Sequence, residues 1–182
     1  PAVTGVQTCA LPISVTALCL SALMLFSPTV MKAENPFMAP YGTPFNMPPF
    51  DKISNSDYLP AFEEGIRQHN QEIEAIINNR AVADFDNTIA ALDNAGQLLE
   101  NVTYVFNGLY DACSTPELQS LGEQILPMLS KHNDEVMMNE RLFSRVKQVY
   151  DNRKKFNLTK PQERLLEKYY KQMVRCGALL SP

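Results

Sequence analysis

Residues 56–76 read SDYLPAFEEGIRQHNQEIEAI and carry the first long helical pattern of the chain. Apolar side chains recur there at intervals of three, four and seven residues, the spacing of one face of an α-helix. Pro60 falls in the first turn after Ser56, where a missing backbone donor costs little because that amide has no helical partner. The pattern predicts an α-helix with Ser56 at its N-cap and a buried stripe of Leu59, Phe62, Ile66, Ile73 and Ile76.

Four more helices are expected, which gives an all-α fold for residues 55–177 without any strand pattern. They begin near Asp84, at Ser114 with Glu117 in capping-box spacing, at Asn139 and at Thr159. Pro127 lies inside the third pattern and predicts a kink in one helix rather than two helices. Gly177 suits the end of the last helix. The expected buried faces comprise Ile89, Leu92, Leu99, Val102, Phe106 and Leu109; Leu118, Leu121, Ile125 and Leu129; Leu142, Phe143, Val146, Val149 and Tyr150; and Leu165, Leu166, Tyr169, Met173 and Cys176.

A proline-rich arm, residues 34–54, precedes these helices. Proline fixes φ and removes a backbone donor, so we expect the arm to be extended and irregular. Four aromatic side chains, Phe37, Tyr41, Phe45 and Phe50, predict that it is anchored along the helical body. A disordered arm is the alternative, and the aromatic content argues against it.

The two ends of the chain are interpreted separately from the fold. Residues 1–13 resemble the translation of a sequencing adapter, and we interpret them as an artefact, with an unusual natural N-terminus as the alternative. Residues 14–33 have the uncharged apolar run of a signal peptide, with Ala33 suited to the cleavage site. At the other end, Ser181-Pro182 would suit the start of another helix, so we expect the helical domain, residues 55–182, to be truncated.

Composition narrows the function classes. The 182 residues carry a formal net charge of −4, and the basic residues are scattered, which disfavours nucleic-acid binding. Cys113 and Cys176 lack the spacing of a metal site, and we expect two independent buried thiols, with a disulfide as the alternative.

No residue stands out as catalytic, cofactor-binding or metal-binding. His69 falls on the first apolar stripe and is interpreted as an interface histidine rather than a ligand or proton carrier. His132 lies among polar residues and is expected to be solvated. The carboxylate pairs Glu63-Glu64 and Asp84/Asp86 fit ordinary helix positions, because acidic side chains favour a helix start.

Several short segments together resemble one known family. They are Asn35-Pro36-Phe37, Pro48-Pro49-Phe50-Asp51, Asp57-Tyr58-Leu59-Pro60-Ala61-Phe62, Phe85-Asp86-Asn87-Thr88-Ile89, Asn139-Glu140-Arg141-Leu142-Phe143, Arg164-Leu165-Leu166-Glu167-Lys168-Tyr169 and Val174-Arg175-Cys176-Gly177-Ala178. In their order and spacing they resemble the N-terminal helical lobe of the M3 zinc metallopeptidases, the thimet oligopeptidase- or neurolysin-like family, especially its bacterial peptidyl-dipeptidases.

The resemblance implies a longer enzyme with two helical lobes that face each other across a channel. Zinc would be held by a downstream His-Glu-x-x-His helix and a later glutamate, and the glutamate of the motif would activate water. Neither histidine of this chain belongs to such a motif, so this part is expected to bind no zinc and to be inactive alone.

The resemblance favours a peptidyl-dipeptidase that removes C-terminal dipeptides from short peptides. An oligopeptidase that cuts internal bonds is the second possibility, and a stand-alone helical binding module is the alternative from another class. The expected partners are short peptide substrates, without nucleic acid and without membrane attachment after signal cleavage. We expect a monomer in the periplasm, or otherwise exported.

Overall fold

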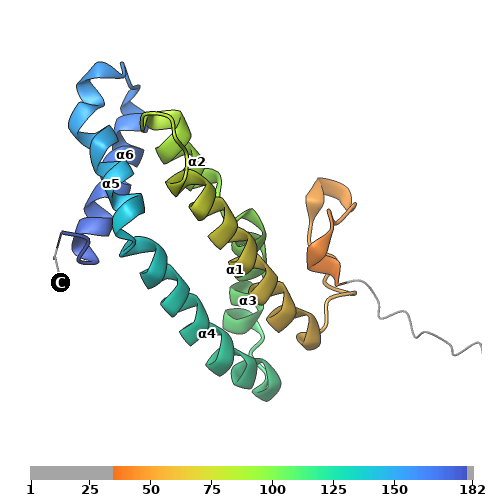
Figure 1. The fold of residues 1–182 in the computed structure, drawn as a ribbon. Coiled ribbons are helices and arrows are strands. Elements are labelled where there is room, and N and C mark those ends of the chain that lie inside the picture. The colour runs from red at the N-terminus through yellow and green to blue at the C-terminus, as the bar shows by residue number, and fades with distance from the viewer. Residues whose placement is uncertain (1–34, 180–182) are drawn as a thin grey trace, which may run out of the picture. The chain divides into compact units, whose positions relative to one another are not determined.

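A computed structural model describes residues 35–179 of the chain. The predicted adapter segment 1–13, the predicted signal peptide 14–33 and the Ser181-Pro182 pair lie outside the described residues. Within residues 35–179 the secondary structure is helical and contains no strand, so the all-α prediction is confirmed. The helices are α1 (Asn55–Ile77), α2 (Ala91–Asn94), α3 (Gln97–Ala112), α4 (Pro116–Met137), α5 (Glu140–Asn152) and α6 (Lys160–Arg175) (Figure 1).

Side-chain caps fix most helix starts where the sequence predicts them. The side chain of Asn87 accepts from the Asp84 amide at 3.1 Å, and the side chain of Asp84 accepts from the Asn87 amide at 2.7 Å. Asn139 accepts from the amide of Leu142, and Thr159 begins α6 with Gln162 in the capping-box position. These bonds satisfy amides that have no partner within the helix, which is why short polar residues lie at these positions.

Two helix starts differ from the prediction. The N-cap of α1 is Ser54 rather than Ser56, because Asp57 can accept a hydrogen bond from the Ser54 amide at 2.8 Å. The N-cap of α4 is Thr115 rather than Ser114, and its side chain accepts from the amide three residues later. Pro127 lies inside α4, which continues to Met137, so the prediction of one helix rather than two is confirmed.

The second predicted helix is not continuous, and this prediction was wrong. Residues Phe85–Ala90 form a π-helical turn that leads into α2, and α3 starts only after Gly96. Gly96 has a φ of 78°, the left-handed conformation that glycine adopts without the steric cost of a side chain. Its amide donates to the carboxylate of Glu72 on α1 at 2.6 Å in place of a helical bond. This hydrogen bond therefore links the start of α3 to α1.

Two hydrophobic cores hold the helices together. The α5–α6 core consists of Ile73, Ile76, Ile77, Ala83, Phe85, Ile89, Leu92, Val136, Leu142, Phe143, Val146, Val149, Leu166 and Met173. The α3–α4 core consists of Phe37, Tyr58, Ala61, Phe62, Val102, Val105, Phe106, Leu118 and Ile125. Accordingly α1 packs along α3 and contacts α4, while α5 packs against α6 (Figure 1). The two cores, with the partly buried side chains packed against them, include the predicted apolar faces except Ile66 and Cys176.

The arm before α1 is less extended than predicted. It contains two 3-10 turns, Pro36–Met38 and Pro44–Asn46. Phe37 is buried in the α3–α4 core and Tyr41 packs partly against it, so two of the four predicted anchors are confirmed. Phe45 and Phe50 are exposed, and their prediction as anchors was wrong. The second turn places Phe45 at a φ of 58°, and its side chain is 99% exposed.

Two further predictions concern residues outside the cores. Cys113 and Cys176 are free thiols, as predicted, but the prediction that both are buried was wrong: Cys113, at the end of α3, is exposed and Cys176 is only partly buried. Among the described helices, none combines the length and the apolar character that a membrane crossing requires.

Candidate functional site

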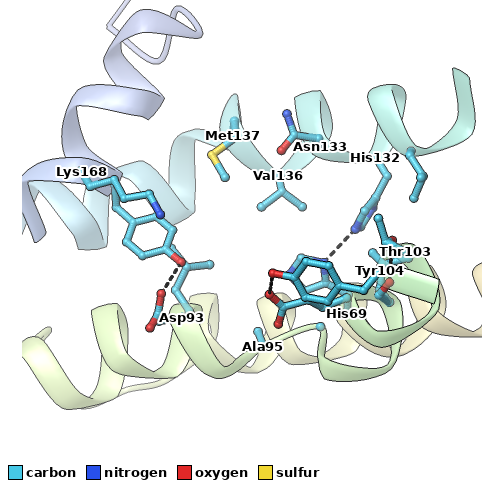
Figure 2. Close-up of a pocket in the computed structure, with 16 residues that line it drawn as sticks. His69, Asp93, Ala95, Thr103, Tyr104, His132, Asn133, Val136, Met137 and Lys168 are labelled. Carbon is cyan, nitrogen blue, oxygen red and sulfur yellow. Dashed lines mark hydrogen bonds between the residues drawn. The ribbon is translucent and has the colours of Figure 1, made fainter. Parts of the chain in front are cut away.

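Two histidines from distant parts of the sequence meet between α1 and α4. The Nδ1 atom of His69 lies 2.9 Å from the Nε2 atom of His132, within hydrogen-bond distance, and the ring planes are inclined by 70° (Figure 2). One ring donates its N–H to the lone pair of the other, so at least one of the two nitrogens must be unprotonated.

The prediction for His132 was wrong, since the residue is buried with 5% of its surface exposed. Its sequence neighbours are polar, but Ile125, Leu129, His132 and Val136 are spaced by four, three and four residues, which places them on one helical face. This spacing is the signal that would have identified it. His69 is half-buried between α1 and α4, so its interpretation as an interface histidine is confirmed.

The histidine pair lines a cavity of about 490 Å³. Residues of α1, α2, α3, α4 and α6 form its walls: His69, Leu92, Asp93, Ala95, Gly96, Leu99, Glu100, Thr103, Tyr104, Leu129, His132, Asn133, Val136, Met137, Lys168 and Tyr169. Asp93 and Lys168 lie toward one end and the two histidines toward the other (Figure 2). The cavity lies where the two cores adjoin, since Leu92 and Val136 belong to one core and Leu99 and Leu129 pack against the other.

Two tyrosine–carboxylate hydrogen bonds lie at this cavity. The hydroxyl of Tyr169 donates to Asp93 at 2.9 Å, and the hydroxyl of Tyr104 donates to Glu100 at 3.1 Å. Burial, followed by the bond to Asp93, raises the pKa of Tyr169 above its ordinary value. For Tyr104 the pKa is raised mainly by the bond to Glu100. Both tyrosines therefore act as hydrogen-bond donors and stay protonated at neutral pH.

Burial favours the neutral form of both imidazoles. It lowers the pKa of His69, and the nearby charge of a protonated His132 would lower it further, while Glu72 acts in the opposite direction. Burial also lowers the pKa of His132, against a smaller opposing effect of Glu135. The Nδ1 atom of His132 is buried and has no hydrogen-bond partner among the described residues. A proton added to this ring would therefore be poorly solvated.

The pair does not fit a zinc site. A catalytic zinc takes three protein ligands and keeps one open position. The two facing nitrogens are committed to their mutual hydrogen bond, and no group of three histidine, cysteine, aspartate or glutamate side chains gathers within residues 35–179. No nucleophile is hydrogen-bonded to either ring among the described residues. The geometry supports a structural link between α1 and α4.

The carboxylate pairs considered in the sequence do not come together as a site. Glu64 accepts from Arg67 and Gln68 on its own helix, and these bonds lower its pKa to about 2, while Glu63 is exposed. Asp84 caps a helix start and Asp86 is exposed. Their interpretation as ordinary helix positions agrees with these contacts.

No protein-family model matches the chain. Among curated proteins, it is 39% identical over 151 residues to the dipeptidyl carboxypeptidase of Escherichia coli, covering 83% of this chain and 22% of that protein. It is 38% identical over 149 residues to the dipeptidyl carboxypeptidase of Salmonella typhimurium, covering 82% of this chain and 22% of that protein. It is 27% identical over 112 residues to oligopeptidase A of Escherichia coli, covering 62% of this chain and 16% of that protein.

The chain thus spans about a fifth of the length of the dipeptidyl carboxypeptidases that it matches. The aligned part is long enough to include most of the described helices, so the similarity is not confined to one motif. The chain is therefore homologous, across most of its own length, to dipeptidyl carboxypeptidase and oligopeptidase A, which are peptidases of the M3 family.

Proposed function

We propose that this chain is a non-catalytic helical part of a zinc-dependent M3 peptidase that acts on short peptides and releases dipeptides from their C-termini. The observation that carries the proposal is the 39% identity over 151 residues to a dipeptidyl carboxypeptidase. Cleavage of internal bonds is the alternative, and the 27% identity to an oligopeptidase supports it less strongly.

A non-catalytic role is supported by the side chains of the described fold. Its two histidines bind each other, and residues 35–179 present no group of three metal ligands. In this proposal the zinc ligands lie in a part of the longer protein outside this chain. Export to the periplasm is a further element of the proposal, and the apolar composition of residues 14–33 supports it.

The proposal is tested on the product of the complete gene, expressed with its own leader. Cells are fractionated, and the periplasmic protein is incubated with an unblocked hexapeptide whose products are identified by mass. We expect dipeptides to be released from the C-terminus and a chelator to abolish the release. Internal cleavage would favour the oligopeptidase, and cleavage that survives zinc removal, or no cleavage at all, would overturn the proposal.

The 182-residue chain provides the second test. Purified alone, it should contain no stoichiometric zinc and should not hydrolyse the hexapeptide. As a control, His132→Gln in the longer protein should leave the zinc content unchanged. Loss of zinc in this variant, with the helical circular dichroism retained, would show that the histidine pair is part of the metal site after all. A longer protein that binds peptides without cleaving them would support a binding module instead.

A further inference from the structure

The arm presents an uncharged apolar surface to solvent. Residues 35–50 contain no Asp, Glu, Lys, Arg or His, although most of them are exposed. The large apolar side chains concerned are Met38, Phe45, Met47 and Phe50, which are 38%, 99%, 55% and 51% exposed. We refer to these four side chains as the arm surface. A depletion of charge together with exposed aromatic and methionine side chains is typical of the centre of a protein interface.

The arm surface is held in place by its own contacts. Phe37 is buried against Tyr58, with ring centroids 5.3 Å apart, and the side chain of Asn35 donates to the carbonyl of Asp57 at 2.8 Å. Two backbone hydrogen bonds close turns in the arm. The amide of Asn46 donates to the carbonyl of Thr43 at 3.0 Å, and the amide of Lys52 donates to the carbonyl of Pro49 at 2.8 Å. The start of the arm is therefore fixed against α1 and the two later turns are closed by their own backbone bonds before any partner arrives, which reduces the conformational entropy lost on docking.

The turn that carries Phe45 is unfavourable in isolation. Phe45 and Asn46 have φ values of 58° and 53°, in the left-handed region that residues with a side chain rarely adopt. This backbone points a phenylalanine almost fully into water. Strain and apolar exposure at the same residue are retained in proteins when a contact compensates for them. Among the described residues Phe45 has no such contact.

We propose that the arm surface is a docking surface for an uncharged apolar surface in the remaining part of the same, longer polypeptide. This inference rests on the proposed function, in which the chain is one part of a peptidase. The length of the relatives supports this occupant, because the matched dipeptidyl carboxypeptidases extend far beyond the 22% that this chain covers. Residues 35–50 carry no charge and offer no ion pair, so apolar burial provides the main attraction.

The test measures whether position 45 becomes inaccessible in the longer protein. Phe45→Cys is introduced into the 182-residue chain and into the complete protein, and the rate of alkylation by N-ethylmaleimide is read for each cysteine by peptide mass spectrometry. Val82→Cys is the matched control, because Val82 is 76% exposed and lies outside the arm. Met47→Cys repeats the measurement with Phe45 intact, in case the first variant itself weakens docking.

We expect alkylation at positions 45 and 47 to be roughly tenfold slower, or more, in the longer protein, since the docked surface must open before it reacts. The rate at position 82 should change little. Equal rates at position 45 in the two proteins, or the same slowing at position 82, would overturn the inference. Protection in the 182-residue chain that grows with its concentration would identify a second copy as the occupant and would also overturn it.

The same preparation separates this inference from the proposed function. A longer protein that releases dipeptides but leaves position 45 reactive contradicts the docking surface alone. A longer protein in which position 45 is protected but no peptide is cleaved contradicts the proposed activity alone.

Discussion

Lowering the pH from about 7.5 to about 5.5 should destabilise the chain through its histidine pair. Burial lowers the pKa of both imidazoles, whereas in the unfolded chain each titrates near the ordinary value of 6.5. If a histidine stays neutral in the fold at about pH 5.5, only the unfolded chain gains from its protonation. The free energy of unfolding is then about 1.4 kcal/mol lower than at about pH 7.5. For the two histidines together the loss of unfolding free energy has an upper limit of about 3 kcal/mol. An ordinary domain has a total free energy of unfolding of roughly 5–15 kcal/mol.

The sign follows from the direction of the pKa shifts. Because the folded pKa values are lowered, the unfolded chain binds more protons below pH 6.5, and protonation favours unfolding. The stabilising effect is fully present above pH 6.5 and is lost as the pH falls below it. Glu72 and Glu135 favour the charged rings and His69 is only partly buried, so we expect a loss of stability smaller than this limit.

The assay is urea unfolding at several pH values between about 5 and about 8, monitored by far-ultraviolet circular dichroism. The control is the double variant His69→Gln/His132→Gln, which keeps polar side chains and removes the titration. Carboxyl groups whose pKa is lowered from 4.5, such as Glu117 and Glu167, titrate below this window and do not contribute to the slope. The same pH dependence in the chain and the double variant would refute the reasoning.

Four further substitutions, of which Gly108→Ala is the comparison for the other two glycines, test the packing by urea unfolding. Gly65→Ala should cost about 1–3 kcal/mol, because its Cβ would lie 3.0 Å from the backbone of Leu99 where α1 and α3 touch. Gly96→Ala should cost about 1–2 kcal/mol because of its left-handed φ of 78°, whereas Gly108→Ala, in the open on α3, should stabilise by up to about 1 kcal/mol. Arg145→Gln should cost about 1–3 kcal/mol, since it removes guanidinium hydrogen bonds of 2.8 and 2.9 Å that join α5 to the segment between α1 and α2. Unchanged unfolding midpoints for Gly65→Ala, Gly96→Ala and Arg145→Gln would contradict the packing described here.

The sequence predicted the helical elements because each carries its own local signals. The caps at Asn139 and Thr159 and the apolar stripes depend only on residues within one or two turns. Such local signals can therefore be read without knowing the tertiary contacts. Local signals did not identify the start of α1, because Ser54 and Ser56 are both suitable N-cap residues. The hydrogen bond from the Ser54 amide to Asp57 selects Ser54.

Tertiary contacts determined what the sequence did not predict. The helix break at Gly96 depends on Glu72, a residue of another helix that accepts from its amide. The histidine pair required knowledge that α1 and α4 pack together at that level, although each ring lies on a regular apolar stripe. Phe45 was predicted as an anchor because aromatic residues favour burial, a rule that does not identify which surface buries them.

The 23 residues of α1 contribute to both hydrophobic cores. Tyr58 and Phe62 lie in the α3–α4 core, while Ile73 and Ile76 lie in the α5–α6 core, and one uninterrupted backbone connects them. Loss of one core would remove the packing from one end of α1, and a helix kept only by propensity is marginal in water. The shared helix therefore couples the two cores, and we expect them to unfold as one cooperative unit.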